Sequence, residues 1–282
     1  MELLIAVLIY LLVLNGFGFI VSAPLKTERL YDLAGSLSFA GAVIVAFVLG
    51  YQNPRQIVLL VIVLIWAIRL GIHLGIRAFT IGDKRFDDIK IRPLVFLGLW
   101  VGQVFWAFVT ALPVYLVMRE DQNDFGTITD IIGIILFIFG FSTEILADFQ
   151  KNQFKKEHPS DPIMTGLFRY VRFPNYLGEW ILWIGITILS ISGWTQGWEF
   201  IGLINIPFVF VLLRFGSGAG ITAKSQNERY GDRPEFQEYC KNTKYFIVNV
   251  ACSFLVLNLA ADPKLRWALR IQINLFSSFN KF

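Results

Sequence analysis

Long apolar runs separated by short polar stretches make up most of the chain. Each run has about 20 residues, the length that an α-helix needs to cross the hydrocarbon core of a bilayer. Lipid offers backbone N–H and C=O groups no hydrogen-bonding partner, so runs of this length must be helical. The pattern therefore predicts seven transmembrane helices, over residues 2–23, 33–51, 56–76, 93–118, 128–150, 175–193 and 198–214. It lacks the ten-residue alternation that is typical of a membrane β-barrel.

The two ends of the chain need separate interpretations. Residues 2–23 have no basic region before them and run longer than the apolar core of a signal peptide, so we expect a retained first span. After Lys244, the next apolar stretch is short for a span, and we expect an interfacial or re-entrant helix there, or an eighth span. We divide the chain into one membrane-embedded domain, residues 1–247, and a C-terminal extension, residues 248–282.

Composition agrees with this fold class, an all-α polytopic membrane protein. Hydrophobic residues make up 55% of the 282 residues and charged residues only 16%, whereas about a quarter of a typical soluble domain is charged. The mean hydropathy is +0.59. Only two histidines are present, which excludes histidine-rich di-iron chemistry and leaves no ligand set for zinc. We therefore expect no metal site.

The positions of lysine and arginine predict the orientation in the membrane. The loops after the first, third, fifth and seventh predicted spans hold 18 of these residues, whereas the intervening loops hold only Arg55 and Arg119. Because cytosolic loops are enriched in lysine and arginine, this asymmetry places the N-terminus in the lumen or outside and the main polar loops in the cytosol. In a eukaryotic cell we expect the endoplasmic reticulum membrane. The same topology explains the basic loops without a nucleic-acid partner.

Polar residues gather at the predicted cytosolic ends of the spans, with helical spacing. Ionisable groups are costly inside a membrane and face a cavity or a partner by default. We expect an enclosed polar chamber, in which cations and hydrogen-bonding groups bind the phosphates and ribose of a nucleotide cofactor. A structural network of salt bridges, or lysines that extend to the lipid headgroups, would also account for some of these residues. The set comprises Arg69, His73, Arg77, Glu144, Asp148, Lys151, Asn175 and Glu179.

Three segments carry more specific patterns. They are GLFRYVRFPNYLGEWILWIGI (166–186), ILADFQKNQFKKE (145–157) and RLGIHLGIRAFTIGDKRFDDI (69–89). Together they resemble the steroid 5-alpha-reductase superfamily, and in particular its branch described as a domain of unknown function. The Asn-Tyr-x-Gly-Glu element is the most specific part, and the resemblance extends over roughly residues 60–247. Many relatives have histidine where this chain has Phe173.

The resemblance implies a membrane-embedded NADPH-dependent reductase, which reduces a C=C bond conjugated to a carbonyl in a lipid or sterol-like substrate. The donor that polarises the carbonyl is a Gln-Glu pair with a tyrosine in the steroid-specific members. This chain has no convincing match to that pair, so the catalytic residues stay unassigned; Gln103 is a candidate for lining the lipid side. Carried over by position or assigned by charge, the cofactor-binding residues are Asp148, Lys155, Arg169, Arg172, Asn175, Tyr176 and Glu179.

Two other functions remain open at this stage. A membrane methyltransferase of the isoprenylcysteine or phospholipid type, with S-adenosylmethionine as donor, has a similar helix entrance, but it needs a downstream Glu-Glu pair. Here Glu228, Glu235 and Glu238 are isolated. A non-enzymatic seven-helix receptor or transporter would place its polar groups near the middle of the bilayer, whereas this chain places them at the cytosolic ends.

Overall fold

The protein is all-helical in the part of the chain that the structure, a computed structural model, describes: residues 2–80, 86–216 and 218–246. This confirms the predicted fold class. The extension, residues 248–282, and its expected interfacial helix lie outside the described residues. The elements are α1 (Glu2–Leu25), α2 (Arg29–Leu49), α3 (Pro54–Thr80), α4 (Pro93–Thr110), α5 (Leu112–Val117), α6 (Ile128–Glu157), η2 (Gly166–Arg169), α7 (Pro174–Ile191), η3 (Gly197–Ile204), α8 (Asn205–Val211), the π-helical turn η4 (Leu212–Gly216), α9 (Ala219–Tyr230) and α10 (Pro234–Asn242).

Six segments in the described residues are long and apolar enough to cross a membrane. Helix α7, the sixth predicted span, is not among them. It is 18 residues long, and the polar residues of its first two turns lower its average hydropathy. The predicted count of seven is therefore not confirmed. The six are Glu2–Leu25, Arg29–Leu49, Pro54–Ile76, Pro93–Thr110, Ile128–Glu157 and Gly197–Tyr230.

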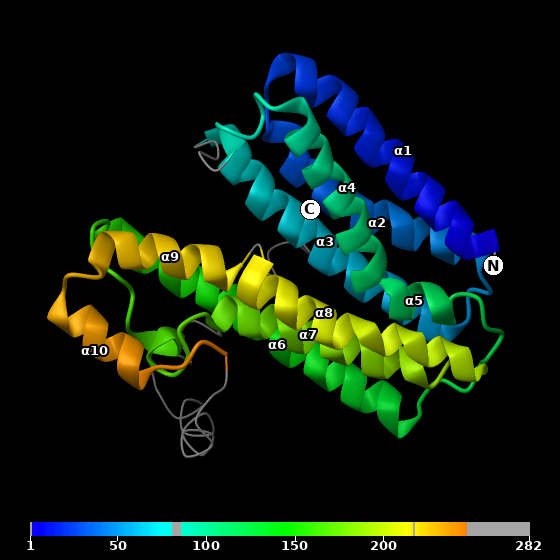
Figure 1. The fold of residues 1–282 in the computed structure, drawn as a ribbon. Helices are drawn as coiled ribbons and strands as arrows, with labels where there is room; N and C mark the ends of the chain where they lie inside the picture. The colour runs from blue at the N-terminus through cyan, green and yellow to red at the C-terminus, as the bar shows by residue number, and fades with distance from the viewer. Residues whose placement is uncertain (1, 81–85, 217, 247–282) are drawn as a thin grey trace, which may run out of the picture. The chain divides into compact units, whose positions relative to one another are not determined.

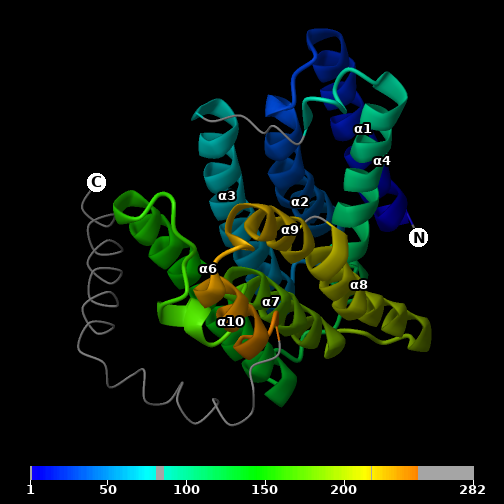
Figure 2. The same cartoon turned by 60° about the vertical axis from the view of Figure 1, so that its left-hand side comes forward.

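The chain forms two compact units, and Figures 1 and 2 show the helices that contribute to them. The first unit comprises Met1–Glu144 and Gly178–Gly220, and the second comprises Ile145–Leu177 and Ile221–Phe282. The boundary falls within α6, α7 and α9, so each of these helices contributes residues to both units. In the first unit, α1 packs against α2 and α4, and α2 packs against α3, as both views show.

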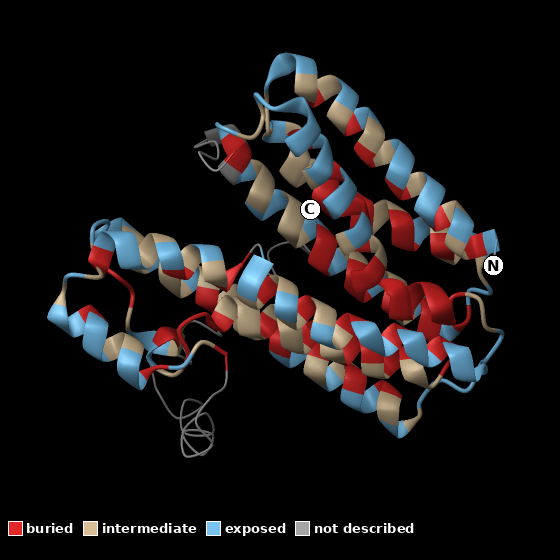
Figure 3. Cartoon of the chain, viewed as in Figure 1, coloured by how far each residue is buried: buried red, intermediate tan, exposed pale blue. Residues whose placement is uncertain are grey.

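Helix α1 buries a narrow stripe and leaves its other faces to lipid. The stripe recurs every three or four residues, the spacing that puts side chains on one face of an α-helix. Gly18 lies in this stripe, and a Cβ atom there would overlap the ring of Trp100 from α4. Figure 3 shows the stripe as red bands on a helix that is otherwise pale. Its members are Leu3, Val7, Leu11, Asn15, Gly18 and Ser22.

A polar contact joins α1, α2 and α4 inside this packing. The Asn15 Nδ2 group donates to the Ser38 hydroxyl at 2.9 Å, and the side-chain amides of Gln103 and Asn15 lie 2.8 Å apart. All three residues are at most 2% exposed. Hydrogen bonds of this kind hold membrane helices together because lipid offers no competing partner. Gln103, a candidate for the lipid side, is thus bonded to another helix in the bundle.

Helices α6 and α7 approach closely at four glycines of the first unit. A Cβ atom on Gly185 would lie 2.6 Å from the carbonyl oxygen of Gly133, and one on Gly178 would lie 2.6 Å from that of Gly140. The reciprocal contacts are equally short. Small residues allow the backbones of membrane helices to touch in this way. The part of α7 from Gly178 to Gly185 is therefore held against the backbone of α6.

Prolines explain two differences from the predicted spans. Residues 93–118 were expected as one helix, but the helix breaks at Ala111, between α4 and α5. Pro113 has no N–H, and its ring clashes with the carbonyl four residues earlier. The predicted helix over 198–214 is a 3₁₀-helix, an α-helix and a π-helical turn in succession. Pro207 also lacks an N–H group, so η3 and α8 do not form one continuous regular helix.

The end of the first unit at which α3 and α6 begin is closed by a buried ion pair. Asn53 and Gln56 form a reciprocal capping box at the start of α3, with bonds of 3.1 and 3.2 Å. Arg55 then makes two hydrogen bonds to the Asp130 carboxylate, at 2.8 and 3.1 Å, and a third to Asp124 at 3.0 Å. The side chains of Arg55 and Asp130 are 0% and 1% exposed.

The second unit packs the polar helices α9 and α10 with the end of α6. Its small core consists of Ala147, Ile163 and Phe168, with Phe154 and Leu167 against them. Helix α10 contributes Phe236, whose ring lies 5.7 Å from the ring of Tyr230 at the end of α9. This unit contains the turn of residues 166–173, in front of α7.

Candidate functional site

The turn of residues 166–173 is fixed by three other segments of the second unit. Gln150 of α6 accepts a hydrogen bond from the Leu167 N–H at 2.8 Å. Tyr239 of α10 donates its hydroxyl to the Phe168 carbonyl at 2.7 Å, and the Arg172 N–H donates to the Lys244 carbonyl at 2.9 Å. Gly166 has a φ of +62°, which a side chain would strain. The turn is therefore held by its own chain.

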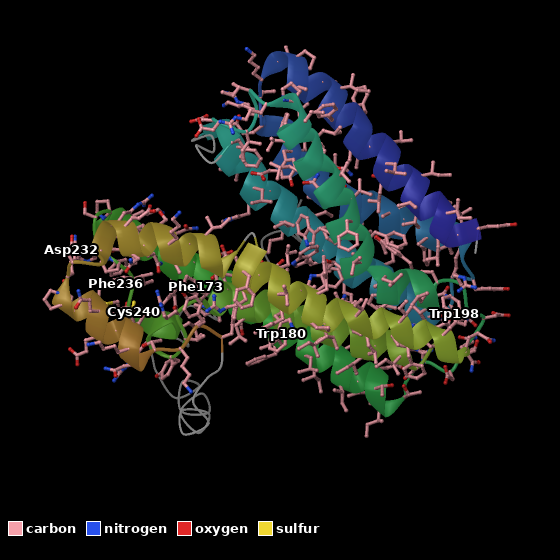
Figure 4. The ribbon with its side chains drawn as sticks, viewed as in Figure 1. Phe173, Trp180, Trp198, Asp232, Phe236 and Cys240 are labelled. Carbon is pink, nitrogen blue, oxygen red and sulfur yellow. The ribbon has the colours of Figure 1, made fainter. Side chains whose placement is uncertain are left out.

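Arg172 is a buried cation at the end of this turn. It is 8% exposed, and its guanidinium lies over the rings of Tyr245 and Phe173, at 4.7 and 5.4 Å from their centroids. The Nε group is buried without a hydrogen-bond acceptor, and no carboxylate of the described residues pairs with it. A buried charge normally has a counter-ion. Figure 4 labels Phe173, beside it in sequence.

The surroundings of Arg172 influence two titratable groups on α10. Burial raises the pKa of the Tyr239 hydroxyl, while the Arg172 charge acts in the opposite direction. Burial also raises the pKa of the Cys240 thiol, again against the effect of Arg172. Both groups are therefore neutral near pH 7, and neither offers Arg172 a negative charge.

Helix α7 begins directly after Arg172 and Phe173. Pro174 is its first residue, as predicted, and proline suits this position because the first N–H groups of a helix have no partner within it. Asn175 and Tyr176 follow in the first turn and are partly buried. The Tyr176 hydroxyl lies 3.3 Å from that of Thr222 on α9. Glu179, one turn beyond Asn175, is assigned to the first unit.

Lys155 is bound by its own chain. Its Nζ group donates to the carbonyls of Asp161 and Pro159, at 2.6 and 3.3 Å, and contacts the Tyr230 hydroxyl at 3.0 Å. Arg233 pairs with the Asp161 carboxylate at 2.9 Å. That hydrogen bond lowers the pKa of Asp161. These contacts fix the loop after α6.

The remaining predicted residues have differing exposure. Arg169 is exposed on η2, and Asp148 is partly buried on α6. Six of the seven predicted cofactor-binding residues thus belong to the second unit, and Glu179 belongs to the first. Among them, Arg172 combines burial with a charge that lacks a counter-ion, whereas the donors of Lys155 are used within the chain.

In the first unit, an ion pair joins two of the residues assigned to the predicted polar chamber. Arg69 of α3 pairs with Glu144 of α6, and the two side chains are 19% and 7% exposed. A Cβ atom on Gly178 would lie 2.7 Å from the backbone nitrogen of Glu144. The Arg69–Glu144 ion pair therefore lies next to the close contact between α6 and α7 at Gly178, the residue before Glu179.

Several residues that shape the site were not predicted from the sequence. Gln150 lies within the segment ILADFQKNQFKKE, where a polar residue in a motif was a usable signal. Tyr239 likewise lies in a Tyr-x-x-x-Thr pattern. Tyr245 and the carbonyl of Lys244 gave no signal, because their contacts with Arg172 depend on how the chain returns after α10.

Comparison with known proteins identifies the family. The family model described as "Protein of unknown function (DUF1295)" matches residues 18–243. An uncharacterized protein of Schizosaccharomyces pombe is 23% identical over 221 residues, which cover 64% of this chain and 61% of that protein. The 3-oxo-5-alpha-steroid 4-dehydrogenase 2 of Sus scrofa is 30% identical over 163 residues, covering 55% of this chain and 58% of the relative.

The corresponding human protein is 32% identical over 138 residues, covering 47% of this chain and 48% of the relative. The chain thus spans less than two thirds of the length of each of these relatives. No solved structure matches it. The resemblance seen in the three sequence segments is confirmed: the chain belongs to the DUF1295 family, within the steroid 5-alpha-reductase-like superfamily.

Proposed function

We propose that the protein is a membrane-embedded, NADPH-dependent reductase of a C=C bond conjugated to a carbonyl in a lipid or sterol-like substrate. The two relatives named 3-oxo-5-alpha-steroid 4-dehydrogenase 2 act, by that name, on 3-oxo-steroids. The six apolar segments agree with a substrate that reaches the protein from the bilayer. We further propose that the N-terminus is lumenal and the second unit is cytosolic.

The observation that carries this proposal is the surroundings of Arg172. Its guanidinium is buried between two aromatic rings, without an anionic partner in the described chain. Two residues later the N-terminus of α7 offers backbone N–H groups, which favour an anion through the helix dipole. A phosphate group supplies the charge that this arrangement lacks. The donor set therefore fits a phosphate-containing cofactor.

The remaining candidates have complementary roles around that phosphate. Arg169 is exposed and contributes a second cation, while Asn175 and Tyr176 offer hydrogen bonds for ribose and amide groups. Asp148 accepts hydrogen bonds from hydroxyl groups. Lys155 acts indirectly, because its bonds fix the loop that leads into the turn of residues 166–173.

The chemistry divides between the cofactor and the protein. When bound, NADPH supplies a hydride to the β-carbon of the conjugated system. Charged residues of the protein hold and orient it, and the apolar helices keep water from the reacting carbon. A hydrogen-bond donor near the substrate carbonyl stabilises the enolate character that develops there.

Cofactor binding tests the proposal directly. We expect NADPH to raise the unfolding temperature of the detergent-purified protein and S-adenosylmethionine to leave it unchanged. The reverse result would favour the methyltransferase. Glu179→Gln and Asn175→Ala should each reduce the NADPH effect while the unliganded protein still folds. Normal NADPH binding by both variants would contradict the site assignment.

Arg172→Met separates binding from folding. Methionine retains apolar contact with the two rings but has no charge, so the unliganded protein should be as stable as the wild type or more so. Loss of one charge-assisted contact should weaken NADPH binding about 10- to 100-fold. Lys156→Ala, which removes an exposed cation of α6, is the control and should bind NADPH normally.

A further inference from the structure

One polar side chain interrupts the apolar face of α6 on which the turn of residues 166–173 packs. The small core of the second unit contains Ala147 and Phe154 of α6 together with Leu167 of the turn. Gln150 lies three positions after Ala147 and four before Phe154, so the three side chains share one face of the helix. Gln150 is half-buried, and its Oε1 atom accepts the Leu167 N–H at 2.8 Å.

The start of η2 depends on this bond from a different element. The first N–H groups of a helix need acceptors from outside it. The Thr165 side chain, directly before η2, makes no capping bond in the described chain. Gln150 supplies the acceptor instead. Gly166 suits the arrangement, because its φ is +62° and a Cβ atom there would overlap the Gln150 side-chain oxygen.

The Leu167 backbone connects Gln150 with the buried cation of the site. The Leu167 carbonyl accepts hydrogen bonds from the Tyr170 and Val171 N–H groups, at 3.1 and 3.4 Å. Arg172 is the next residue along the chain. The bond from Gln150 therefore fixes the short piece of backbone from which Arg172 projects.

Apolar packing by itself would not set the position of the turn. Hydrophobic contact is non-directional, so Leu167 could shift along α6 and stay buried. An N–H···O hydrogen bond depends on both distance and angle, and a shift of about 1 Å would break it. The Gln150 bond thus gives the turn one defined position on α6, which apolar contact alone does not.

We propose that Gln150 is a positioning residue of the cofactor site, whose side chain sets where the turn, and with it Arg172, lies on α6. This inference rests on the proposed function, in which Arg172 binds a phosphate group of NADPH. Gln150 acts through the backbone of the turn and not through contact with the cofactor. A cation that is already in place loses less freedom when the phosphate binds, so binding is tighter.

Hydrogen exchange tests the positioning without any ligand. In Gln150→Met the Leu167 N–H has no acceptor, so the amide protons of residues 167–171 in the detergent-purified protein should exchange about tenfold faster than in the wild type. Gln150→Glu keeps an acceptor oxygen at the same side-chain length and should restore slow exchange. Gln153→Met, the matched control on α6, changes an exposed glutamine without a side-chain hydrogen bond among the described residues. Unchanged exchange in Gln150→Met would overturn the inference.

NADPH binding tests the link to Arg172. Gln150→Met should weaken NADPH binding about tenfold, and Gln153→Met should leave it unchanged. In the Arg172→Met background, Gln150→Met should change binding less than about twofold, because a positioning residue has no effect once the group that it positions is gone. A tenfold effect that persists in that background would overturn the inference.

The two measurements separate this inference from the proposed function. Exchange at the turn does not involve NADPH. A wild-type protein whose turn depends on Gln150 but which binds no NADPH would contradict the proposed function and leave the positioning of the turn supported. Normal NADPH binding by the wild type, with no effect of Gln150→Met on binding, would overturn the role of Gln150 alone.

Discussion

Two buried guanidinium groups in this protein have opposite surroundings. Arg55 is surrounded by carboxylates, whereas Arg172 has aromatic rings on its faces and no carboxylate among the described residues in contact. A fully paired charge of the first kind has a structural role. A buried charge without a counter-ion, such as that of Arg172, can pair with an anionic ligand. Both arginines are buried, so burial alone does not distinguish a structural role from a binding role. The partners of each guanidinium do.

Removing one partner of Arg55 should destabilise the fold. Asp130→Asn leaves the buried guanidinium with Asp124, whose side chain is 51% exposed, as its carboxylate partner. The loss should therefore be about 2–3 kcal/mol, less than the roughly 3–5 kcal/mol of a buried charge left without a counter-ion. Thermal unfolding in detergent measures the loss. Arg55→Met combined with Asp130→Asn removes both charges and keeps an acceptor for the Gly126 and Thr127 N–H groups, so it should recover part of the loss. A double variant less stable than Asp130→Asn would show that the network acts in another way.

Asp161 should give the second unit a pH-dependent contribution to stability. Its pKa lies below the ordinary value of 3.8 because Arg233 donates a hydrogen bond to the carboxylate. The contribution is therefore fully present above about pH 4 and is lost as the pH falls through the lowered pKa. The stability difference between wild type and Asp161→Asn, measured against pH, should shrink in that acidic range. A difference that persists there would contradict this assignment.

The contact between α6 and α7 leaves no room for an added methyl group. A Cβ atom on Gly185 would lie 2.6 Å from both the Gly133 carbonyl oxygen and the Phe137 nitrogen. Because both neighbours are backbone atoms, the helices would have to separate. Gly185→Ala should therefore lower the free energy of unfolding by about 1–3 kcal/mol. Gly102→Ala on α4, where nothing lies within 4 Å, is the control and should be neutral or slightly stabilising.

Helix boundaries followed from the sequence where one apolar run formed one helix. The first three predicted spans agree with α1, α2 and α3 to within a few residues. The breaks at Ala111 and Asn205 were missed because hydropathy does not respond to the missing N–H of proline. The pairing of Asn15 with Gln103 was not predictable in this way, since it depends on how α1 and α4 rotate against each other.

For the candidate site, the motif located the turn but not its surroundings. The start of α7 at Pro174 was correctly predicted from the run RFPNYLGE. The rings and carbonyl around Arg172 include those of Tyr245 and Lys244, more than 70 residues away. Lys155 is bound both by the nearby Pro159 and Asp161 carbonyls and by the distant Tyr230. The sequence therefore identified candidate cations by their charge. It did not show which of these cations lacks a counter-ion in the folded protein.

At the scale of the whole molecule, the distribution of lysine and arginine predicts the orientation. In sealed microsomes, whose cytosolic face is outward, an epitope tag at the N-terminus should be protected from added protease. A tag in the loop after α6, between Glu157 and Gly166, should be cleaved. Detergent should make both accessible. An N-terminal tag that is cleaved in intact vesicles would contradict the predicted topology.

The Arg55–Asp130 pair also has a consequence for the order of synthesis. The two residues are 75 positions apart, and Arg55 begins a helix that enters the bilayer long before α6 leaves the ribosome. Until then the guanidinium is without its main counter-ion. Nascent α3 must keep its first turn at the aqueous boundary, and this end of the first unit can close only after α6 has been made.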